Sequence, residues 1–361
     1  MSVLVAVEGA LPPHRYRQAQ ITDAFIDAND FDDQQVALTR RFHASSQVEH
    51  RYLAYPIETY TDFNDFTTTN DAYIAAALEL GEAAIRSALS CAGLQPHDVD
   101  IILTTSVTGL AVPSLDSRLA SRLGLRDDIT RLPLFGLGCA GGAGGIARMH
   151  DQLLAWPDRV AVLLAVEVCS LTTQRGDASM PHLVASALFG DGAAAVVAVG
   201  EQHPLARADS DAASASRRPR VIATASRLYP DTERAMGWDI GSWGLRIVLD
   251  AQVPDLVETH LRSDVEEFLG RYELKLDDID TWVCHPGGPK VLEAVQTALD
   301  LPREAVELTW KSLADIGNLS SASVLHVLHH TLLTTTPAAG SYGLLVSMGP
   351  GFAAELVLLQ W

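Results

Sequence analysis

The segment RLPLFGLGCAGGAGGIARMHDQLL, residues 131–154, decides how the rest of this chain is interpreted. A short apolar run ends at Gly136, and apolar residues recur at helical spacing beyond Gly145, which predicts a buried strand, a sharp glycine turn and a helix. Cys139 lies in that turn, where the unpaired N–H groups of a helix N-terminus favour an anion. The position predicts a lowered thiol pKa and a nucleophilic thiolate. The nearby glycines are expected to leave clearance around the sulfur.

Two other interpretations of the turn stay open at this point. A lone cysteine among apolar residues is most often an inert core residue. Gly136, Gly138 and Gly141 also match the pattern G-x-G-x-x-G, and the next apolar run ends at Glu167, which would bind a ribose in a dinucleotide-binding fold. The turn alone therefore also permits a dehydrogenase, so the decision depends on the rest of the chain.

Size and composition indicate a globular α/β protein. The chain has 361 residues, 48% of them hydrophobic, which is enough for one large core or two fused ones. Its first residues carry no basic start and no cleavage site, and no apolar run is long enough to cross a membrane. We therefore expect a cytoplasmic protein with no membrane partner.

Charge and cysteine spacing exclude several classes of function. With 26 basic against 45 acidic residues, the formal charge is −19, which argues against nucleic acid as a partner. The cysteines are widely spaced, so we expect neither a disulfide framework nor a zinc site. His326, His329 and His330 have helical spacing, but no cysteine or carboxylate joins them, so no metal is expected.

The second part of the chain repeats the plan of the first. The sequence LQPHDVD at 94–100 precedes the apolar run IILTTS, and LKLDDID at 274–280 precedes TWVCHPGG. A helix, a short turn and a buried strand are predicted in both places. The stretch around residue 211 is rich in Ala, Ser, Asp and Arg without hydrophobic period, so we divide the chain into halves 1–210 and 211–361. Two such halves predict a duplicated, layered α/β fold.

Each half also supplies residues that suit acyl transfer. His285 follows a predicted strand and enters a Pro-Gly-Gly-Pro loop, and Asn318 precedes an apolar helix. A thiolate paired with an imidazolium attacks a thioester, while side-chain N–H donors hold the negative charge on its oxygen. Separately, His285 is equally well a structural histidine and Asn318 a helix cap. Asp191, in a Gly-Asp-Gly turn, is expected to accept a backbone hydrogen bond.

Taken together, the motifs of the chain resemble those of the type III polyketide synthases, the chalcone synthase-like members of the thiolase superfamily. The resemblance covers nearly the whole chain and rests on the sequences GCAGG (138–142), ALFGDGAAA (187–195), HPGGPK (285–290), GNLSSAS (317–323) and GPGF (349–352). It implies a thiolase-like, five-layered αβαβα sandwich and a homodimer. It also implies coenzyme A thioesters as substrates, malonyl-CoA and an acyl-CoA starter, with no bound cofactor.

The resemblance assigns the chemistry residue by residue. Cys139 resembles the nucleophile that takes the starter acyl group, and His285 and Asn318 resemble the pair that binds the malonyl thioester carbonyl during decarboxylation. Phe189 matches the aromatic residue between the coenzyme A tunnel and the product cavity. These assignments predict iterative condensation of malonyl units on a cysteine thioester, followed by cyclisation to a pyrone, resorcinol, phloroglucinol or naphthalene-type product.

Other matched positions concern binding. Arg41 and Lys290 match residues that meet the phosphates of coenzyme A, where a cation is physically required. Val112 matches a loop residue that the family inserts into the partner subunit's cavity. The expected cavity-lining positions are Val107, Thr172, Trp238, Ile247 and Ser320. Ile247 stands where plant members have phenylalanine and Trp238 where a small residue is usual, so a chalcone product is not implied.

Two rival functions remain at the level of sequence. A ketoacyl-ACP synthase III-like condensing enzyme shares the Cys, His and Asn set, although the HPGGPK loop and the terminal GPGF motif weigh against it. The NAD-dependent dehydrogenase suggested by the glycine pattern does not predict duplicated halves. The starter acyl group, the number of extensions and the mode of ring closure are not determined by these motifs.

Overall fold

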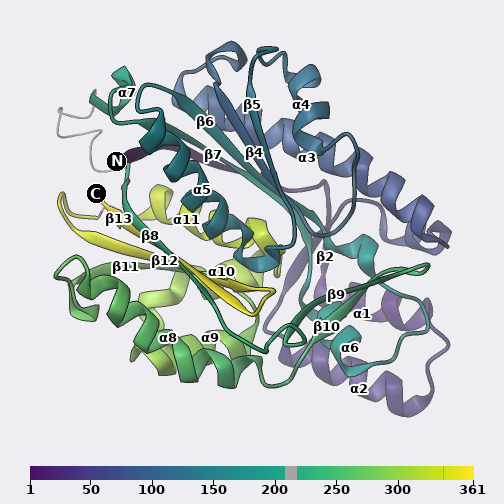
Figure 1. The fold of residues 1–361 in the computed structure, drawn as a ribbon. Helices are drawn as coiled ribbons and strands as arrows, with labels where there is room; N and C mark the ends of the chain where they lie inside the picture. Colours follow the sequence, from purple (N-terminus) through teal and green to yellow (C-terminus); the bar gives the residue numbers. More distant parts are fainter. Residues whose placement is uncertain (208–217, 336) are drawn as a thin grey trace.

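The computed structural model describes residues 1–207, 218–335 and 337–361 (Figure 1). In the first half, three parallel strands are followed by two antiparallel ones. The three parallel strands follow one another in the sequence. The two antiparallel strands lie beside them, toward the middle of the molecule. In spatial order these strands are β5 (Thr130–Leu134), β4 (Ile101–Thr105), β6 (Val160–Val168), β7 (Asp191–Gly200) and β1 (Ser2–Ala10).

The second half forms a similar sheet, one strand shorter among the described residues. Its first pair is parallel and the remaining pairs are antiparallel. The two sheets touch where Ser2 pairs with Val221, so their strands form one continuous nine-stranded sheet. In spatial order the strands are β11 (Ile279–Cys284), β12 (Tyr342–Gly349), β13 (Ala353–Gln360) and β8 (Arg220–Leu228).

Helices complete five layers, as the family resemblance predicted (Figure 1). One helical layer covers the outer face of the first sheet, one lies between the sheets, and one covers the outer face of the second. The helices are α3 (Phe66–Ala92) and α4 (Leu115–Leu123) in the first layer, α5 (Gly141–Ala155) and α11 (Ser323–Thr334) in the middle, and α8 (Val253–Gly270) and α9 (Pro289–Leu299) in the last.

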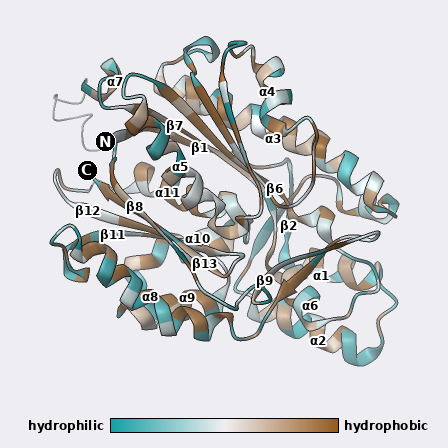
Figure 2. Cartoon of the chain, viewed as in Figure 1, coloured by the Kyte–Doolittle hydropathy of each residue, from teal (hydrophilic) through white to brown (hydrophobic). Residues whose placement is uncertain are grey.

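Alternation along the strands explains why helices cover both faces of each sheet. Successive side chains of a strand point to opposite faces. In β11, Trp282 and Cys284 pack with α8 and α9, whereas Val283 packs in the middle layer with α5 and α11. Strands β6 and β7 are buried on both faces and largely apolar, and they are mostly brown in Figure 2. Parallel strands buried on both faces are expected to read this way.

The repeated sequence before β4 and β11 forms the same local structure twice. The 3-10 helices η2 (Pro96–Asp98) and η7 (Leu276–Asp278) precede the two strands. Asp98 accepts a hydrogen bond from the Gln95 N–H at 2.8 Å, and Asp278 accepts one from the Lys275 N–H at 2.7 Å. The internal repeat inferred from the sequence therefore corresponds to a repeated structural unit.

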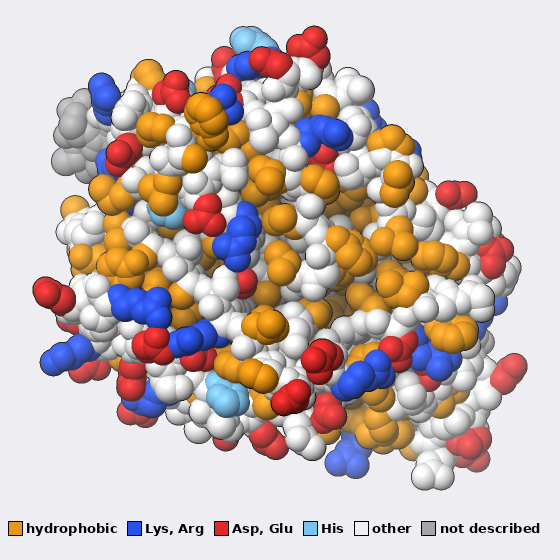
Figure 3. Space-filling model, in the orientation of Figure 1, with side chains coloured by type: hydrophobic (Ala, Val, Ile, Leu, Met, Phe, Trp, Pro, Cys, Tyr) orange, Lys and Arg blue, Asp and Glu red, His pale blue; other side chains and the backbone are white. Residues whose placement is uncertain are grey.

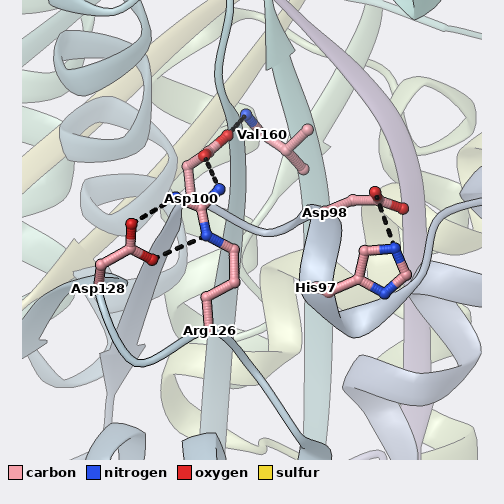
Figure 4. A network of polar contacts seen from close by, with 6 residues as sticks. All are labelled: His97, Asp98, Asp100, Arg126, Asp128 and Val160. Atoms are coloured by element: carbon pink, nitrogen blue, oxygen red, sulfur yellow. Dashed lines mark hydrogen bonds and ion pairs between the residues drawn. The ribbon is translucent and has the colours of Figure 1, made fainter.

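At the start of β4, one carboxylate links neighbouring strands (Figure 4). Asp100 accepts a hydrogen bond from the Val160 N–H at 2.9 Å and forms an ion pair with Arg126 at 2.8 Å. Arg126 also pairs with Asp128 at 2.7 Å. This network lies at the amino ends of β4 and β6, whereas Cys139 and His285 follow the carboxyl ends of β5 and β11.

The remaining elements gather at one side of the molecule, and we call this group the cap (Figure 1). The cap comprises residues 14–63, 180–188 and 236–249. Its elements are β2 (His14–Arg17), α1 (Gln18–Asp27), α2 (Asp33–Ser45), β3 (His50–Leu53), η1 (Ile57–Asp62), α6 (Met180–Leu188), β9 (Met236–Gly241) and β10 (Gly244–Leu249). Outside the cap lie α7 (Pro204–Arg207) and α10 (Glu307–Ile316), together with the short 3-10 helices η4 (Cys169–Thr172) and η8 (Arg303–Val306).

One local expectation is corrected by the structure. The strand before the Cys139 turn is not buried: β5 is the edge of the sheet, and Phe135 beyond it is 55% exposed. Helices α1 and α2 are separate because Asp32 caps the second one through the Gln35 N–H. The long helix α3 is capped at its start by Asp65. The proposed division at residue 211 lies outside the described residues.

Candidate active site

Cys139 lies in the 3-10 helix η3 (Gly138–Ala140), between β5 and α5, and is buried. The glycines around it are required by close packing. A Cβ on Gly141 would lie 2.6 Å from the Thr105 hydroxyl, and one on Gly142 would lie 2.4 Å from the Ser321 carbonyl oxygen. These glycines therefore allow the turn and α5 to pack closely against Thr105 in the first half and Ser321 in the second. The clearance around the sulfur that the sequence predicted is not their role.

His285 follows β11 and is also buried. Its N–H donates to the Val346 carbonyl at 2.9 Å, which continues the pairing with β12. Neither ring nitrogen has a hydrogen-bond partner in the protein. Burial lowers the pKa of His285 from 6.5 to about 3, because transfer from water disfavours the charged imidazolium. The ring is therefore neutral near pH 7 and leaves both nitrogens available to a ligand.

Asn318 follows helix α10 and Gly317. Its side chain does not cap α11, whose N-cap residue is Ala322. The Asn318 Oδ1 atom accepts the Ser320 N–H at 2.8 Å, and Nδ2 donates to the Gly287 carbonyl at 3.1 Å. These contacts fix the amide with its donor group toward the loop that carries His285.

Ser320 connects Asn318 to the cysteine. Its hydroxyl lies 3.8 Å from the Cys139 sulfur, and its backbone has a φ of 48°, which non-glycine residues seldom adopt. The bond from its N–H to Asn318 stabilises this conformation. Through Ser320 on one side and Gly287 on the other, the fold brings Cys139, Asn318 and the His285 loop together. We call Cys139, His285, Asn318 and Ser320 the condensing centre.

The electrostatics of Cys139 differ from the prediction. Burial raises the pKa of the thiol to about 12, and the carboxylate of Glu167 adds to the rise, while hydrogen bonds from Ser320 and Asn318 oppose it. The desolvation of a fully buried thiolate outweighs the favourable end of α5. In the resting centre the Cys139 thiol and the His285 imidazole are thus both neutral.

Glu167 is the second-last residue of β6 and a buried carboxylate, and no motif indicates its partners. Oε2 accepts hydrogen bonds from Ser106, from the Val107 N–H at 3.1 Å and from Thr108 at 2.9 Å. Oε1 accepts from Ser321 at 2.5 Å, across the interface between the halves. A ribose-binding role is wrong for this residue, because its oxygens are already occupied by protein donors.

A cavity of about 460 Å³ lies between the cap and the segment 169–175. Four of the predicted binding residues line it: Phe189, Thr172, Trp238 and Ile247. Trp238 and Ile247 face each other as paired residues of the β9–β10 hairpin. In the space-filling view, hydrophobic side chains gather over this hairpin on the visible face (Figure 3).

Phe189 joins this cavity to the condensing centre. Its backbone forms a bridge with Asn318: the Asn318 N–H donates to Leu188 and the Gly190 N–H donates to Asn318. Two other predicted lining residues are elsewhere. Ser320 lies against Cys139, and Val107 donates its N–H to Glu167.

Sequence reasoning missed several polar residues of the cavity wall. Tyr60, Ser170, Arg51 and His182 line it, and the two last are buried with one nitrogen each lacking a partner. None of them belongs to a recognisable motif, and they come from separate elements. Only long-range tertiary contacts bring these four residues together.

The remaining predicted residues lie on the surface. Arg41 on α2 and Lys290 in the first turn of α9 are exposed. Val112 is 95% exposed and does not line the 460 Å³ cavity. Two histidines of α11 meet backbone carbonyls: His326 meets that of Ala193 at 3.0 Å and His329 that of Val7 at 2.5 Å, while the ring of His330 lies 5.9 Å from that of His329.

The layered duplication defines the fold class as that of the thiolase-like condensing enzymes. The chain also matches two family models, described as chalcone and stilbene synthases, N-terminal domain (residues 1–202) and C-terminal domain (residues 220–361). The chain therefore belongs to the chalcone and stilbene synthase family and is a type III polyketide synthase, a condensing acyltransferase. Enzymes of this type act on coenzyme A thioesters. The dehydrogenase alternative is thereby wrong.

Known relatives agree with this assignment. The chain is 52% identical over 362 residues to 1,3,6,8-tetrahydroxynaphthalene synthase of Streptomyces peucetius subsp. caesius, covering 99% of this chain and 93% of the relative. It is 32% identical to a putative chalcone synthase of Bacillus subtilis (strain 168), covering 100% and 99%. The crystal structure of the tetrahydroxynaphthalene synthase of Streptomyces coelicolor A3(2) superimposes with a TM-score of 0.91 at 30% identity over 99% of both chains.

Proposed function

We propose that this enzyme condenses malonyl units on Cys139, with His285 and Asn318 as the residues that hold the malonyl thioester. The observation that carries the proposal is their convergence. Cys139 lies 3.8 Å from the Ser320 hydroxyl, and Asn318 is held between Ser320 and Gly287, two residues after His285. Cys139, His285 and Asn318 are buried, and the His285 imidazole is unpartnered. Buried polar groups without partners are rare in folded proteins, so the nitrogens of His285 indicate a place where a ligand supplies the acceptor.

The first step loads the starter. The thiol proton of Cys139 moves to the imidazole of His285 as sulfur attacks the thioester carbonyl, and coenzyme A leaves with that proton. Because the pKa of Cys139 is raised and that of His285 lowered, the neutral pair predominates until the thioester arrives. Attack and proton transfer are then coupled, as in general-base activation of a nucleophile.

The second step uses the same pocket for malonyl-CoA. Loss of carbon dioxide leaves an enolate, whose oxygen accepts hydrogen bonds from one ring N–H of His285 and from Asn318 Nδ2. A neutral imidazole has one N–H to donate, and an amide does not lose its proton near pH 7. The enolate carbon then forms a carbon–carbon bond to the acyl carbon on Cys139, and sulfur leaves as thiolate.

The product class follows from the relatives and from the cavity. Relatives named tetrahydroxynaphthalene synthase and phloroglucinol synthase are 52% and 30% identical to the chain. We propose a tetrahydroxynaphthalene-type product, whose ten ring carbons with alternating oxygens correspond to five two-carbon units. Malonyl-CoA alone is sufficient to supply them. Trp238 and Ile247 line the cavity together with Phe189, and we propose that these bulky side chains favour such a compact product over a long alkyl chain.

A homodimer fits the exposed apolar surface of the first half. Val112 is 95% and Phe135 55% exposed, and β5 presents an unpaired edge among the described residues. Exposed sheet edges and apolar side chains of this kind are usually covered by a partner. We propose that a second copy covers them and that Val112 enters its cavity. Arg41 and Lys290 are proposed to bind the phosphates of coenzyme A.

Localisation and cofactor use are also proposals. No helix in the described part of the chain is long and apolar enough to span a bilayer. We propose a cytoplasmic enzyme, because coenzyme A thioesters are cytoplasmic metabolites, and one that needs no bound cofactor for the steps above.

The decisive experiment supplies radiolabelled malonyl-CoA, with and without a panel of acyl-CoA starters. We expect release of carbon dioxide and formation of an aromatic product from malonyl-CoA alone, identified by mass spectrometry. Absence of carbon dioxide release with every starter would contradict the proposal. Malonyl-acyl carrier protein is tested in parallel, because its exclusive use would favour the ketoacyl-ACP synthase III-like alternative.

A further inference from the structure

A chain of hydrogen bonds runs from the cavity wall to a buried carboxylate, and the mechanism above does not use it. The Tyr60 hydroxyl lies 2.6 Å from the Ser170 hydroxyl, which donates to Asp191 Oδ2 at 2.5 Å. Tyr60 and Ser170 line the cavity, and Asp191 is fully buried at the start of β7. The three residues come from the cap, from η4 and from the first sheet, so tertiary structure alone assembles the chain.

The carboxylate of Asp191 is held firmly. It accepts the Ala54 N–H at 2.7 Å and the Ser170 N–H at 2.8 Å. The expected backbone hydrogen bond is therefore present, but its donors are distant in sequence and Asp191 begins β7 instead of forming a local turn. The nearest cation, Arg51, donates instead to Gln18 and to the Phe189 carbonyl. Burial raises the pKa of Asp191 from 3.8 to about 6, so the carboxylate is ionised near pH 7 yet is more basic than an exposed one.

The direction of the hydrogen bonds follows from counting donors. Ser170 has one hydroxyl proton, which it gives to Asp191. Tyr60 must therefore give its own proton to Ser170, since a hydroxyl has only one. The Tyr60 oxygen is left as an acceptor, with only a long 3.4 Å contact from the Tyr55 N–H. On the wall of a cavity proposed to hold a polyketone, such an oxygen is complementary to the O–H of an enol tautomer.

We propose that Tyr60 accepts the enol proton during carbon–carbon ring closure, with Ser170 and Asp191 as positioning residues that pass the proton on. This inference rests on the proposed function. The enol proton moves to Tyr60, the Tyr60 proton to Ser170 and the Ser170 proton to Asp191. The enol carbon forms a bond to the thioester carbonyl carbon, the carbon–sulfur bond breaks, and Cys139 leaves as thiolate. The charge lost by Asp191 equals the charge gained by sulfur.

The competing outcome is a lactone. A six-membered lactone forms when an enol oxygen attacks the thioester, and that oxygen lies only a few atoms from the sulfur. This closure takes place beside Cys139 and does not require the far wall of the cavity. Slower carbon–carbon closure therefore diverts the chain to pyrone, whereas loading and decarboxylation at His285 and Asn318 are unaffected.

The test compares Tyr60→Phe with Tyr55→Phe as the matched control. Tyr55 lies on the same segment, but its hydroxyl donates to the Ala72 carbonyl at 2.9 Å, outside the cavity. With radiolabelled malonyl-CoA, carbon dioxide release and the ratio of aromatic product to pyrone are measured separately. We expect Tyr60→Phe to lower the ratio about tenfold or more, with carbon dioxide release per enzyme within about twofold of the parent. Tyr55→Phe keeps the parent ratio.

Ser170 provides a second, independent variant. Ser170→Ala interrupts the chain of hydrogen bonds and is expected to lower the ratio of aromatic product to pyrone. Ser170→Thr keeps a hydroxyl and is expected to keep the parent ratio. An unchanged ratio in Tyr60→Phe, or in Ser170→Ala should Tyr60→Phe not fold, would overturn the inference. Equal shifts in Tyr60→Phe and Tyr55→Phe would overturn it too, since only packing would then matter. A parent enzyme that releases no carbon dioxide would instead contradict the proposed function.

Discussion

The condensing centre and the cavity are neighbours built in different ways. Backbone contacts of the duplicated halves hold the centre: Asn318 is fixed through Ser320 and Gly287, and the Cys139 turn fits because glycines permit close packing. The cavity wall comes largely from the cap, which interrupts the repeated plan. We therefore expect residues of the duplicated halves to carry out bond formation and residues of the cap to determine which product forms.

Phe189 is the point where the two regions meet. Its side chain lines the cavity, while its backbone pairs with Asn318. A change of side chain there alters the cavity without breaking the pairing that positions the amide. The two regions should accordingly respond to substitution independently, except where a residue contacts both.

The strongest separation is expected for Cys139→Ala. Polyketide formation should fall by about a thousandfold or more, because the growing chain is proposed to be held as a thioester on Cys139. Malonyl-CoA decarboxylation should persist, since it depends on His285 and Asn318. Cys284→Ala is the matched control: this buried cysteine precedes His285 but packs in the core against α8 and α9. Equal loss of both activities in Cys139→Ala would contradict the division of roles.

His285→Ala should remove both activities of the centre. Decarboxylation is expected to fall by about a hundredfold or more, as for loss of an oxyanion donor. The product ratio of the residual activity should stay at the parent value, because the cavity is untouched. Carbon dioxide release and the ratio of aromatic product to pyrone are measured together. A shifted ratio with normal carbon dioxide release would contradict the assignment of His285 to decarboxylation.

The raised pKa of the Cys139 thiol predicts a steep pH dependence of alkylation. Below a pKa of about 12, the thiolate fraction rises about tenfold per pH unit, so iodoacetamide labelling of Cys139 should accelerate throughout pH 6–9. The labelled residue is identified by mass spectrometry, with exposed Cys91 as the internal reference. A rate that is constant over this range would indicate a preformed thiolate pair with His285.

Ile247→Trp should alter the cavity and spare the centre. The larger ring fills space opposite Trp238, so we expect shorter chains and a product distribution shifted several-fold. Carbon dioxide release from malonyl-CoA should change by less than about threefold. Ile240→Trp is the control on the same hairpin, since that side chain is 57% exposed and lies outside the cavity.

The smallest effect is expected at the Asp100 network, which contacts neither region. Arg126→Ala removes exposed ion pairs to Asp100 and Asp128, and such pairs contribute little to stability. Activity and product ratio should match the parent, and the melting temperature should fall by a few degrees at most. A changed product ratio would mean that the two regions are coupled through the first sheet.

Local sequence determined much of this protein. The order of the motifs indicated the family, and the repeated turns before β4 and β11 indicated the duplication. Helix α3 ends at Gly93 with a φ of 70°, and such a capping signal depends on neighbouring residues only. The positions of Cys139 and His285 beyond strand ends followed from the same short-range patterns.

Tertiary structure decided the rest. The pKa of Cys139 rises instead of falling, because burial depends on every layer around the sulfur. Asn318 meets Ser320 and Gly287 through a path after α10 that no periodicity indicates. Tyr60 reaches Asp191 across more than a hundred residues, through Ser170. Residue type and spacing are sufficient to predict reactive groups, whereas their protonation, partners and surroundings depend on contacts between distant segments.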